Sequence, residues 1–159
     1  MSDNPSFDMK PTYVTDEVLA GLKKLPTATV YNAVRYFGST LCVCEGLQNF
    51  TPGKKMAARA KTLRFLPHRA DLKTDTPAGE NAPEYVAMGK CGPGDVLVAD
   101  LQGRTKDVVA GDVKLLQLKM NNADGVVIDG AIRDLDVLRD ENMDSSFTLQ
   151  PAVFMVVQP

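Results

Sequence analysis

Two apolar runs with a helix-length segment between them constrain the fold of this chain more than any other feature. Residues 96–99 and 126–128 have the length and composition of buried strands. Four apolar residues between the runs recur at helical spacing and fall on one face: Val109, Val113, Leu116 and Met120. A strand, a helix and a strand in this order and at these lengths predict one right-handed βαβ crossover with parallel strands.

Charged residues stand where such a unit binds its ligands, beyond the carboxyl ends of its strands. The segment GAIRD ends the second strand with Arg133 and Asp134, while Gly111 and Asp112 begin the crossover helix. An arginine is suited to an anion, an aspartate to a hard metal ion, and a helix N-terminus offers unpaired amides. The sequence therefore predicts that these groups converge on one small pocket.

A structural interpretation of the same residues remains open. Arg133 could pair with Asp134, or with Asp129, and do no more than hold a loop in place. The residue types taken alone favour this interpretation. The spacing and the surrounding sequence, described below, favour a small-molecule site instead.

The composition disfavours several other classes of protein. The net charge is −2 and there is no block of basic residues, which disfavours nucleic acid as a direct partner. No apolar run is long enough to span a membrane, and the segment MSDNPSFDMKP lacks the hydrophobic region of a signal peptide. The odd set of cysteines, Cys42, Cys44 and Cys91, indicates reduced thiols, so we expect a cytoplasmic protein.

Two kinds of residue that commonly carry chemistry have little support here. Cys42 and Cys44 have the spacing of a metal or redox pair, but alternating cysteines in an apolar stretch are more often small core residues. His68 is the only histidine and falls in a polar, turn-rich segment, where a solvated side chain is the favoured interpretation. A triad built on a histidine base would have to use it, so triad hydrolysis is disfavoured.

The remaining elements are expected to form a helical layer and further strands. Thr15 is expected to cap a helix that ends near Lys24. Pro26 should stop that helix, Thr27 should cap a second one, and Gly38 should follow its last turn. Further elements are expected at residues 58–66 (strand), 81–88 (short helix), 134–140 (helical turns) and 154–157 (strand).

The spacing of the charged residues carries a family resemblance. Asp112 is followed after twenty residues by Arg133 and Asp134, within the segment GVVIDGAIRD. This pattern resembles the RraA-like family, and the segments LPTATVYNAVRYFG, ARAKTLRF and PGDVLVAD extend the resemblance over roughly residues 20–157. The family includes 4-hydroxy-4-methyl-2-oxoglutarate aldolases and the regulator of ribonuclease activity A. The resemblance implies an α/β fold, with a layered β/β/α swivelling-domain-like core and a central βαβ unit.

The resemblance also implies a chemistry. The aldolase members use a divalent metal ion to cleave 4-hydroxy-2-oxo acids to pyruvate, and they decarboxylate oxaloacetate. By resemblance, Asp134 would hold Mg²⁺, or Mn²⁺ or another divalent cation, through one carboxylate and water. Arg133 would bind the pyruvyl carboxylate or bridge to its keto oxygen, and Asp112 would hold a water in the path of the proton. The amides of Val113 and Lys114 would receive the substrate carboxylate.

That chemistry asks for these residue types on general grounds as well. Breaking a carbon–carbon bond beside a 2-keto group leaves an enolate, whose charge a nearby cation stabilises. An arginine stays charged at all working pH values, and its fork matches a carboxylate in a way that a lysine does not.

The chain departs from the family pattern at two places. Val137 stands where many members carry an acidic residue. Family chains usually continue further and supply an acidic residue to a neighbouring subunit's site. We therefore expect one RraA-like domain over residues 1–159, shortened at its C-terminus, with slow turnover and assembly as a homotrimer or a pair of trimers.

Two other functions compete with the aldolase. The first is a non-catalytic RraA-like regulator that binds a ribonuclease or an RNA helicase; such members tend to lose the aspartate of the Arg-Asp pair, so Asp134 favours an enzyme. The second is the methyltransferase label that such chains have carried (dimethylmenaquinone methyltransferase-like). It is rejected because there is no Gly-rich nucleotide loop followed by an acidic residue.

Overall fold

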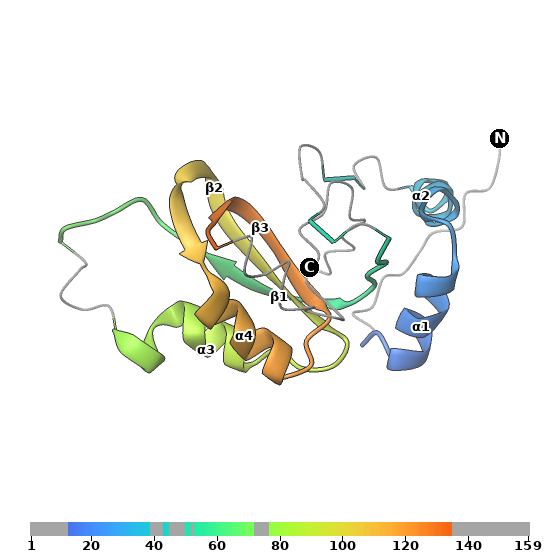
Figure 1. Cartoon of the computed structure of the whole chain (residues 1–159). Coiled ribbons are helices and arrows are strands. Elements are labelled where there is room, and N and C mark those ends of the chain that lie inside the picture. Colours follow the sequence, from blue (N-terminus) through green and yellow to red (C-terminus); the bar gives the residue numbers. More distant parts are fainter. Residues whose placement is uncertain (1–12, 39–42, 45–49, 52, 72–76, 135–159) are drawn as a thin grey trace.

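A computed structural model describes residues 13–38, 43–44, 50–51, 53–71 and 77–134, and Figure 1 shows their arrangement. The expected elements at residues 135–140 and 154–157, with Cys42 and Val137, lie outside these residues. The elements in chain order are α1 (Asp16–Lys24), α2 (Thr27–Tyr36), β1 (Arg59–Arg64), a 3₁₀ turn η1 (Gly79–Asn81), α3 (Pro83–Gly89), β2 (Asp95–Ala110), α4 (Asp112–Met120) and β3 (Gly125–Ile132). None of the described helices has the length and apolar character needed to cross a membrane.

The described strands form one parallel sheet in the order β1-β2-β3. Val96 of the central strand lies between Ala60 of β1 and Gly125 of β3. The chain leaves β2, forms α4 and returns as β3 parallel to β2, so the predicted βαβ unit is confirmed. The α/β class is confirmed with it.

Helices α3 and α4 pack together on one face of this sheet, below it in Figure 1. Leu97, Ala99 and Leu101 of β2 point to this face, and so do Val126 and Ile128 of β3. The largest fully buried side chains are Met88, Leu97, Leu101, Leu115, Leu118 and Val126. Burial of apolar surface at about 25 cal/mol per Å² makes this layer the main source of stability.

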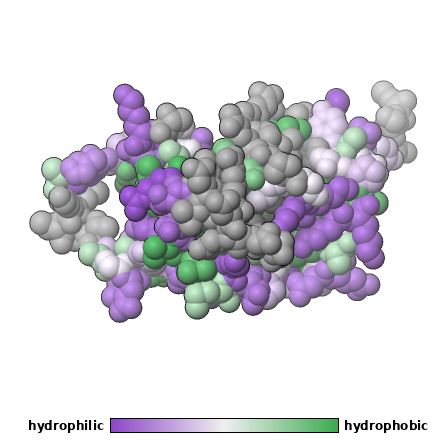
Figure 2. All heavy atoms as spheres, in the orientation of Figure 1, coloured by the Kyte–Doolittle hydropathy of each residue, from purple (hydrophilic) through white to green (hydrophobic). Residues whose placement is uncertain are grey.

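The predicted apolar face of the crossover helix was wrong. Val109 belongs to β2, and Val113, Leu116 and Met120 are exposed on the outer side of α4. The sequence DVKLLQLKM carries two apolar stripes, and the other stripe, Leu115 and Leu118, is the buried one. Helical periodicity alone could not choose between them. Figure 2 shows hydrophobic side chains gathered at the lower left, over the region of α3 and α4, among mostly hydrophilic ones.

Strand β2 leaves its regular register beyond Asp100 and curls over before α4, as Figure 1 shows. The turn begins at Gln102 and Gly103, whose φ angles are 60° and 68°. The Gly103 amide donates to the Asp129 carboxylate at 2.8 Å, which ties the turn to β3. Beyond the turn, the strand pairs with β3 only at isolated positions, with Arg104, Val108 and Ala110 opposite Gly130, Ala131 and Ile132. The sequence had indicated only a short strand at 96–99.

The caps of the first two helices were predicted in part. The Thr15 hydroxyl accepts a hydrogen bond from the Val18 amide, as expected for an N-cap. Thr27 is the first residue of α2 rather than its cap, because the helix already restarts after the extended Pro26. Gly38 follows the last turn of α2 with φ +95°, as predicted.

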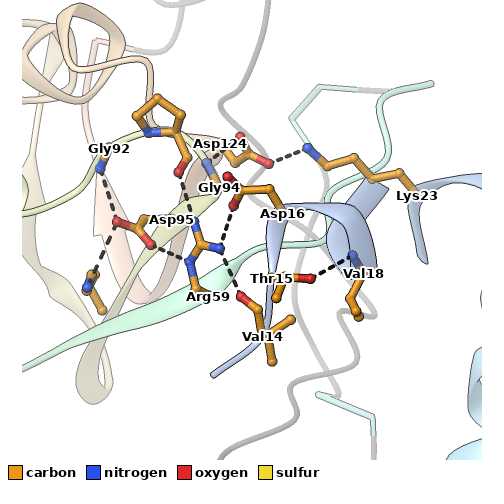
Figure 3. Close-up of polar contacts among 12 residues, drawn as sticks. Val14, Thr15, Asp16, Val18, Lys23, Arg59, Gly92, Gly94, Asp95 and Asp124 are labelled. Atoms are coloured by element: carbon orange, nitrogen blue, oxygen red, sulfur yellow. Dashed lines mark hydrogen bonds and ion pairs between the residues drawn. The ribbon is translucent and has the colours of Figure 1, made fainter. Parts of the chain in front are cut away.

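Arg59 joins α1 to the amino-terminal edge of the sheet (Figure 3). Its guanidinium donates to Asp16 at 2.6 Å, to Asp95 at 3.2 Å, and to the carbonyl oxygens of Val14 and Pro93 at 3.0 Å. The hydrogen bond to Asp16 raises the pKa of Arg59, despite the opposing effect of burial, so the charge is permanent. This network lies at the edge of the sheet opposite the start of α4.

The two stripes of α4 give a direct test of the packing. Leu118 is 0% exposed and Leu116 is 40% exposed. Leu118→Ala should lower the free energy of unfolding by about 2–5 kcal/mol, because it removes buried apolar atoms and leaves a cavity. Leu116→Ala, the same change two residues away on the exposed face of the helix, should lower it by less than about 1 kcal/mol. Urea unfolding measures both; equal losses would contradict the orientation of α4.

Candidate functional site

The end of β3 lies beside the start of α4. The Arg133 amide donates to the Ala110 carbonyl oxygen at 3.2 Å, which continues the pairing of the two strands to their carboxyl ends. Gly111, between β2 and α4, is approached by both Arg133 and Asp134. A Cβ at Gly111 would collide with the Asp134 carboxylate and crowd the Arg133 side chain. A side chain at this position could be accommodated only if the Asp134 carboxylate and the Arg133 side chain shifted, so the close approach of the two segments favours glycine.

A pocket of about 220 Å³ opens at this junction. It is lined by residues of α3, the returning part of β2, the first turn of α4 and the end of β3: Tyr85, Val108, Val109, Ala110, Gly111, Asp112, Val113, Lys114 and Arg133. Four residues expected at the site, Asp112, Val113, Lys114 and Arg133, are thus brought together. Asp134 is not part of the lining but lies against Gly111, next to it.

Arg133 and Asp134 form an ion pair, with 3.2 Å between Nε and Oδ2. Asp129 was the other possible partner of Arg133, but its carboxylate accepts the Gly103 amide instead. Asp134 has φ +63°, in the left-handed region that few non-glycine residues adopt. An aspartate held in such a conformation at a pocket rim is a reason to consider a functional role.

The first turn of α4 offers part of the predicted anion receptor. Gly111 at the N-cap has no side chain to cap the helix. The Val113 amide donates to the Asp112 carboxylate at 2.7 Å, so an incoming anion would compete with Asp112 for it. No described residue accepts from the Lys114 amide, and the Leu115 amide bonds Gly111 within the helix. The helix dipole adds a partial positive charge at this end.

The ion pair between Glu84 of α3 and Lys114 of α4 was not predicted from the sequence. The Lys114 ammonium donates to Glu84 at 2.9 Å and to the Val109 carbonyl oxygen at 3.3 Å, and it lies 5.2 Å from the centre of the Tyr85 ring. Burial acts to raise the pKa of Glu84, but the hydrogen bond from Lys114, a backbone hydrogen bond and the charge of Lys114 together outweigh it, so the pKa is lowered. Only the neighbouring placement of α3 and α4 on one sheet face could have indicated this pair.

Asp134 suits a hydrated magnesium ion held by one carboxylate, but not a metal site made wholly of protein side chains. The described residues contain no group of three or more histidine, cysteine, aspartate or glutamate side chains that could hold a metal ion. A metal cage made wholly of these side chains is therefore absent from this part of the chain. Mg²⁺, however, commonly binds one or two carboxylates and keeps several waters. The Asp134 carboxylate, half of it engaged by Arg133, suits such a hydrated ion.

The other candidate residues lie away from the pocket lining. His68 is exposed on the segment that follows β1. Cys44 and Cys91 are free thiols, and burial raises the pKa of Cys91 to about 11, so this thiol is unreactive at neutral pH. Asp107 pairs with Arg104 at 3.0 Å on the curled part of β2. None of these residues adds a reactive group to the pocket.

Comparisons with known proteins agree on one family. The profile of the RraA-like family, described as Aldolase/RraA, matches residues 27–148. A Halalkalibacterium halodurans protein that carries the provisional name 4-hydroxy-4-methyl-2-oxoglutarate aldolase is 41% identical over 58 residues, which are 36% of this chain and 28% of that protein.

Three solved structures resemble the fold. Streptomyces coelicolor RraAS2, an unusual member of the RNase ES inhibitor RraA protein family, has a TM-score of 0.69 and 26% identity over 81% of this chain and 60% of its own. An uncharacterized Pseudomonas syringae pv. tomato protein has a TM-score of 0.70 and 24% identity, over 90% of this chain and 60% of its own. The RNA-processing inhibitor RraA from Thermus thermophilus has a TM-score of 0.54 and 19% identity, over 79% of this chain and 65% of its own. This chain thus spans less than two thirds of each relative.

The Glu84–Lys114 pair makes a pH-dependent contribution to stability that can be measured. Because the folded-state pKa of Glu84 lies below its ordinary value of 4.5, the contribution is complete at neutral pH and is lost as the pH falls through the folded-state value. Glu84→Gln should therefore lower the unfolding free energy at pH 7 by up to about 1 kcal/mol. The difference from wild type should shrink as the pH falls below 4.5 and vanish once the pH is below the folded-state pKa, as urea unfolding at several pH values would show.

The exposed Glu80, in the turn before α3, provides the matched control. Glu80→Gln should leave the unfolding free energy at pH 7 nearly unchanged. A Glu84→Gln difference that grows toward low pH would have the wrong sign for an ionised, paired carboxylate.

Proposed function

This chain belongs to the RraA-like family, and from that premise we propose that it is a divalent-metal-dependent lyase acting on small 2-oxo acids. The proposed reactions are the class II aldol cleavage of 4-hydroxy-2-oxo acids to pyruvate and the decarboxylation of oxaloacetate. The family also contains ribonuclease inhibitors, so membership alone does not select the enzyme. The observation that carries the proposal is the convergence of Arg133, Asp112 and the start of α4 on one pocket, with Asp134 at its rim.

The pocket has the groups that bind a 2-oxo carboxylate. The Arg133 guanidinium is engaged by Asp134 through Nε, and no other described residue pairs with it. Its remaining N–H donors are available to a carboxylate, with the Lys114 amide and the positive end of α4 as further partners. Holding the carboxylate there fixes the adjacent keto group within the pocket.

Both reactions pass through the same intermediate, the enolate of pyruvate. In each substrate the bond that breaks joins C3, the carbon beside the keto group, to C4. The electron pair of that bond stays on the pyruvyl part and forms the enolate of pyruvate. Protonation of the enolate at C3 completes the reaction. Asp112 is the acidic side chain in the pocket lining and would hold the water that delivers the proton. Loss of CO₂ needs no base, whereas aldol cleavage also needs one to remove the hydroxyl proton.

Asp134 is the residue proposed to hold the metal ion, with water completing the coordination. A bound Mg²⁺ or similar cation would supply the positive charge that polarises the keto oxygen. Asp134 would keep its second oxygen on Arg133, so that the two residues position one another. Assembly into trimers remains a prediction from the resemblance alone, and a cytoplasmic location remains a prediction from the cysteine content.

A regulator of RNA processing is the second candidate. It is supported by the 26% identity to RraAS2, which belongs to a family of RNase ES inhibitors. The aspartate of the Arg-Asp pair, present as Asp134, favours the enzyme. Adding the chain to a ribonuclease ES cleavage assay tests the alternative: inhibition at stoichiometric amounts, with no lyase activity, would favour the regulator.

Asp134→Asn tests the metal assignment. The change keeps the size of the side chain but removes its charge, so Mg²⁺-dependent decarboxylation of oxaloacetate should fall at least about 100-fold. The melting temperature should stay within a few degrees of wild type because the side chain is on the rim. Activity of the wild type should disappear with EDTA and return with excess Mg²⁺. Activity that survives full chelation would contradict the metal mechanism.

Arg133→Lys tests the anion receptor. A charge-assisted hydrogen bond contributes about 1.5–3 kcal/mol, so kcat/KM for oxaloacetate should fall roughly 10- to 100-fold, and inhibition by oxalate should weaken in parallel. Arg64→Lys is the matched control, since Arg64 also pairs with an aspartate, Asp100, but does not line the pocket. Unchanged oxalate inhibition in Arg133→Lys would favour the structural interpretation of the Arg133–Asp134 pair.

A further inference from the structure

Much of the pocket lining is apolar, and the reaction proposed above gives these side chains no role. They come from three elements: Tyr85 of α3, Val108, Val109 and Ala110 of β2, and Val113 of α4. Val109 and Ala110 are buried in the core, but Val108 is 50% exposed and Val113 is 68% exposed. An apolar group of a ligand that covered these two valines would remove their surface from water, which is favourable. The two exposed valines therefore offer one side of the pocket to an apolar part of a substrate.

The charged groups at the pocket match a ligand with one carboxylate. Arg133 pairs with Asp134, and Lys114 pairs with Glu84, so each cation already has an anionic partner. Asp112 adds a third carboxylate to the lining. Two cations and three carboxylates leave one negative charge over, which a bound divalent ion would turn into one positive charge. The carboxylate beside the keto group balances that charge, and a second carboxylate would leave the pocket with an uncompensated negative charge.

We propose that Val108 and Val113 bind the end of the substrate remote from the keto group, and that this end is an uncharged alkyl chain. The inference rests on the proposed function, and it narrows the substrates of aldol cleavage to 4-hydroxy-2-oxo acids with a single carboxylate. In that cleavage the C3–C4 bond breaks, the alkyl chain leaves as an aldehyde, and the hydroxyl proton is returned through water to C3 of the enolate. Oxaloacetate still reacts, because its second carboxylate leaves as CO₂ and apolar surroundings favour the loss of that charge.

Two six-carbon 2-oxo acids test the nature of this end. 2-Oxohexanoate ends in a methyl group, whereas 2-oxoadipate has the same chain length and ends in a second carboxylate. Calorimetry of the full chain in buffer containing Mg²⁺ gives both dissociation constants. 2-Oxohexanoate should bind at least about 10-fold more tightly, because its end covers the valines and brings no second charge. Equal binding of the two acids, or tighter binding of 2-oxoadipate, would overturn the inference.

Matched lysine substitutions on α4 locate the effect in the pocket. Val113→Lys places a cation in the lining, so it should reduce the preference for 2-oxohexanoate at least about 10-fold. Met120→Lys makes a similar change on the same exposed stripe of α4, at a residue that is 74% exposed and does not line the pocket, and should leave the preference unchanged. Equal effects of the two lysines would assign the preference to the overall charge of the protein and would also overturn the inference.

A polar substitution of the other valine tests the apolar contact without a change of charge. Val108→Thr keeps the branched shape of the side chain and adds a hydroxyl group. It should raise the dissociation constant of 2-oxohexanoate by about threefold or more, because the hydroxyl loses hydrogen bonds to water when the alkyl chain covers it. An unchanged dissociation constant would contradict the contact with Val108.

Decarboxylation of oxaloacetate on the same preparation separates this inference from the proposed function. A preference for 2-oxohexanoate that Val113→Lys removes, without any decarboxylation, would support the apolar site and overturn the lyase. Mg²⁺-dependent decarboxylation, with 2-oxoadipate bound as tightly as 2-oxohexanoate, would support the lyase and overturn the apolar site. Binding of neither acid would overturn the apolar site as well.

Discussion

The parallel pairing of β3 with β2 is the interaction on which the candidate site of this molecule depends. Two strands that run in the same direction end at the same edge of the sheet. The helix that follows β2 must therefore begin where β3 ends, and the hydrogen bond from Arg133 to Ala110 fixes that meeting. A helix N-terminus, an arginine and two aspartates come together for this reason. Asp112 and Arg133 are far apart in sequence because α4 and β3 lie between them.

The curled part of β2 forms one wall of the pocket at that junction. Between the Asp100–Asp129 pair and the Ala110–Ile132 pair, β2 advances by ten residues and β3 by three. The extra length bends away from the sheet and returns as Val108, Val109 and Ala110, which line the pocket. Leu101, where the bend starts, packs so closely on Gly130 that a Cβ there would clash. Small residues in GAIRD thus serve packing, while its charged end serves the pocket.

The cationic side chains at the two ends of the sheet differ in how many of their N–H donors are bound by protein acceptors. At the amino-terminal edge, Arg59 is enclosed by protein acceptors from α1 and the turn before β2, which leaves it a structural role (Figure 3). At the carboxyl edge, Arg133 and Lys114 keep donors that no described residue accepts. An arginine and a lysine with unused donors beside a helix N-terminus are what an anionic ligand needs.

The sequence by itself determined the elements and the spacing of the charged residues. Apolar runs, the Thr15 cap and Gly38 are local signals, and the βαβ order follows from their succession. Asp112, Arg133 and Asp134 could be placed at one edge because parallel strands share their ends. Only the tertiary structure decided which stripe of α4 is buried, how β2 curls, and that Lys114 meets Glu84. Each of these depends on contacts between residues far apart in sequence, for which periodicity and propensity carry no information.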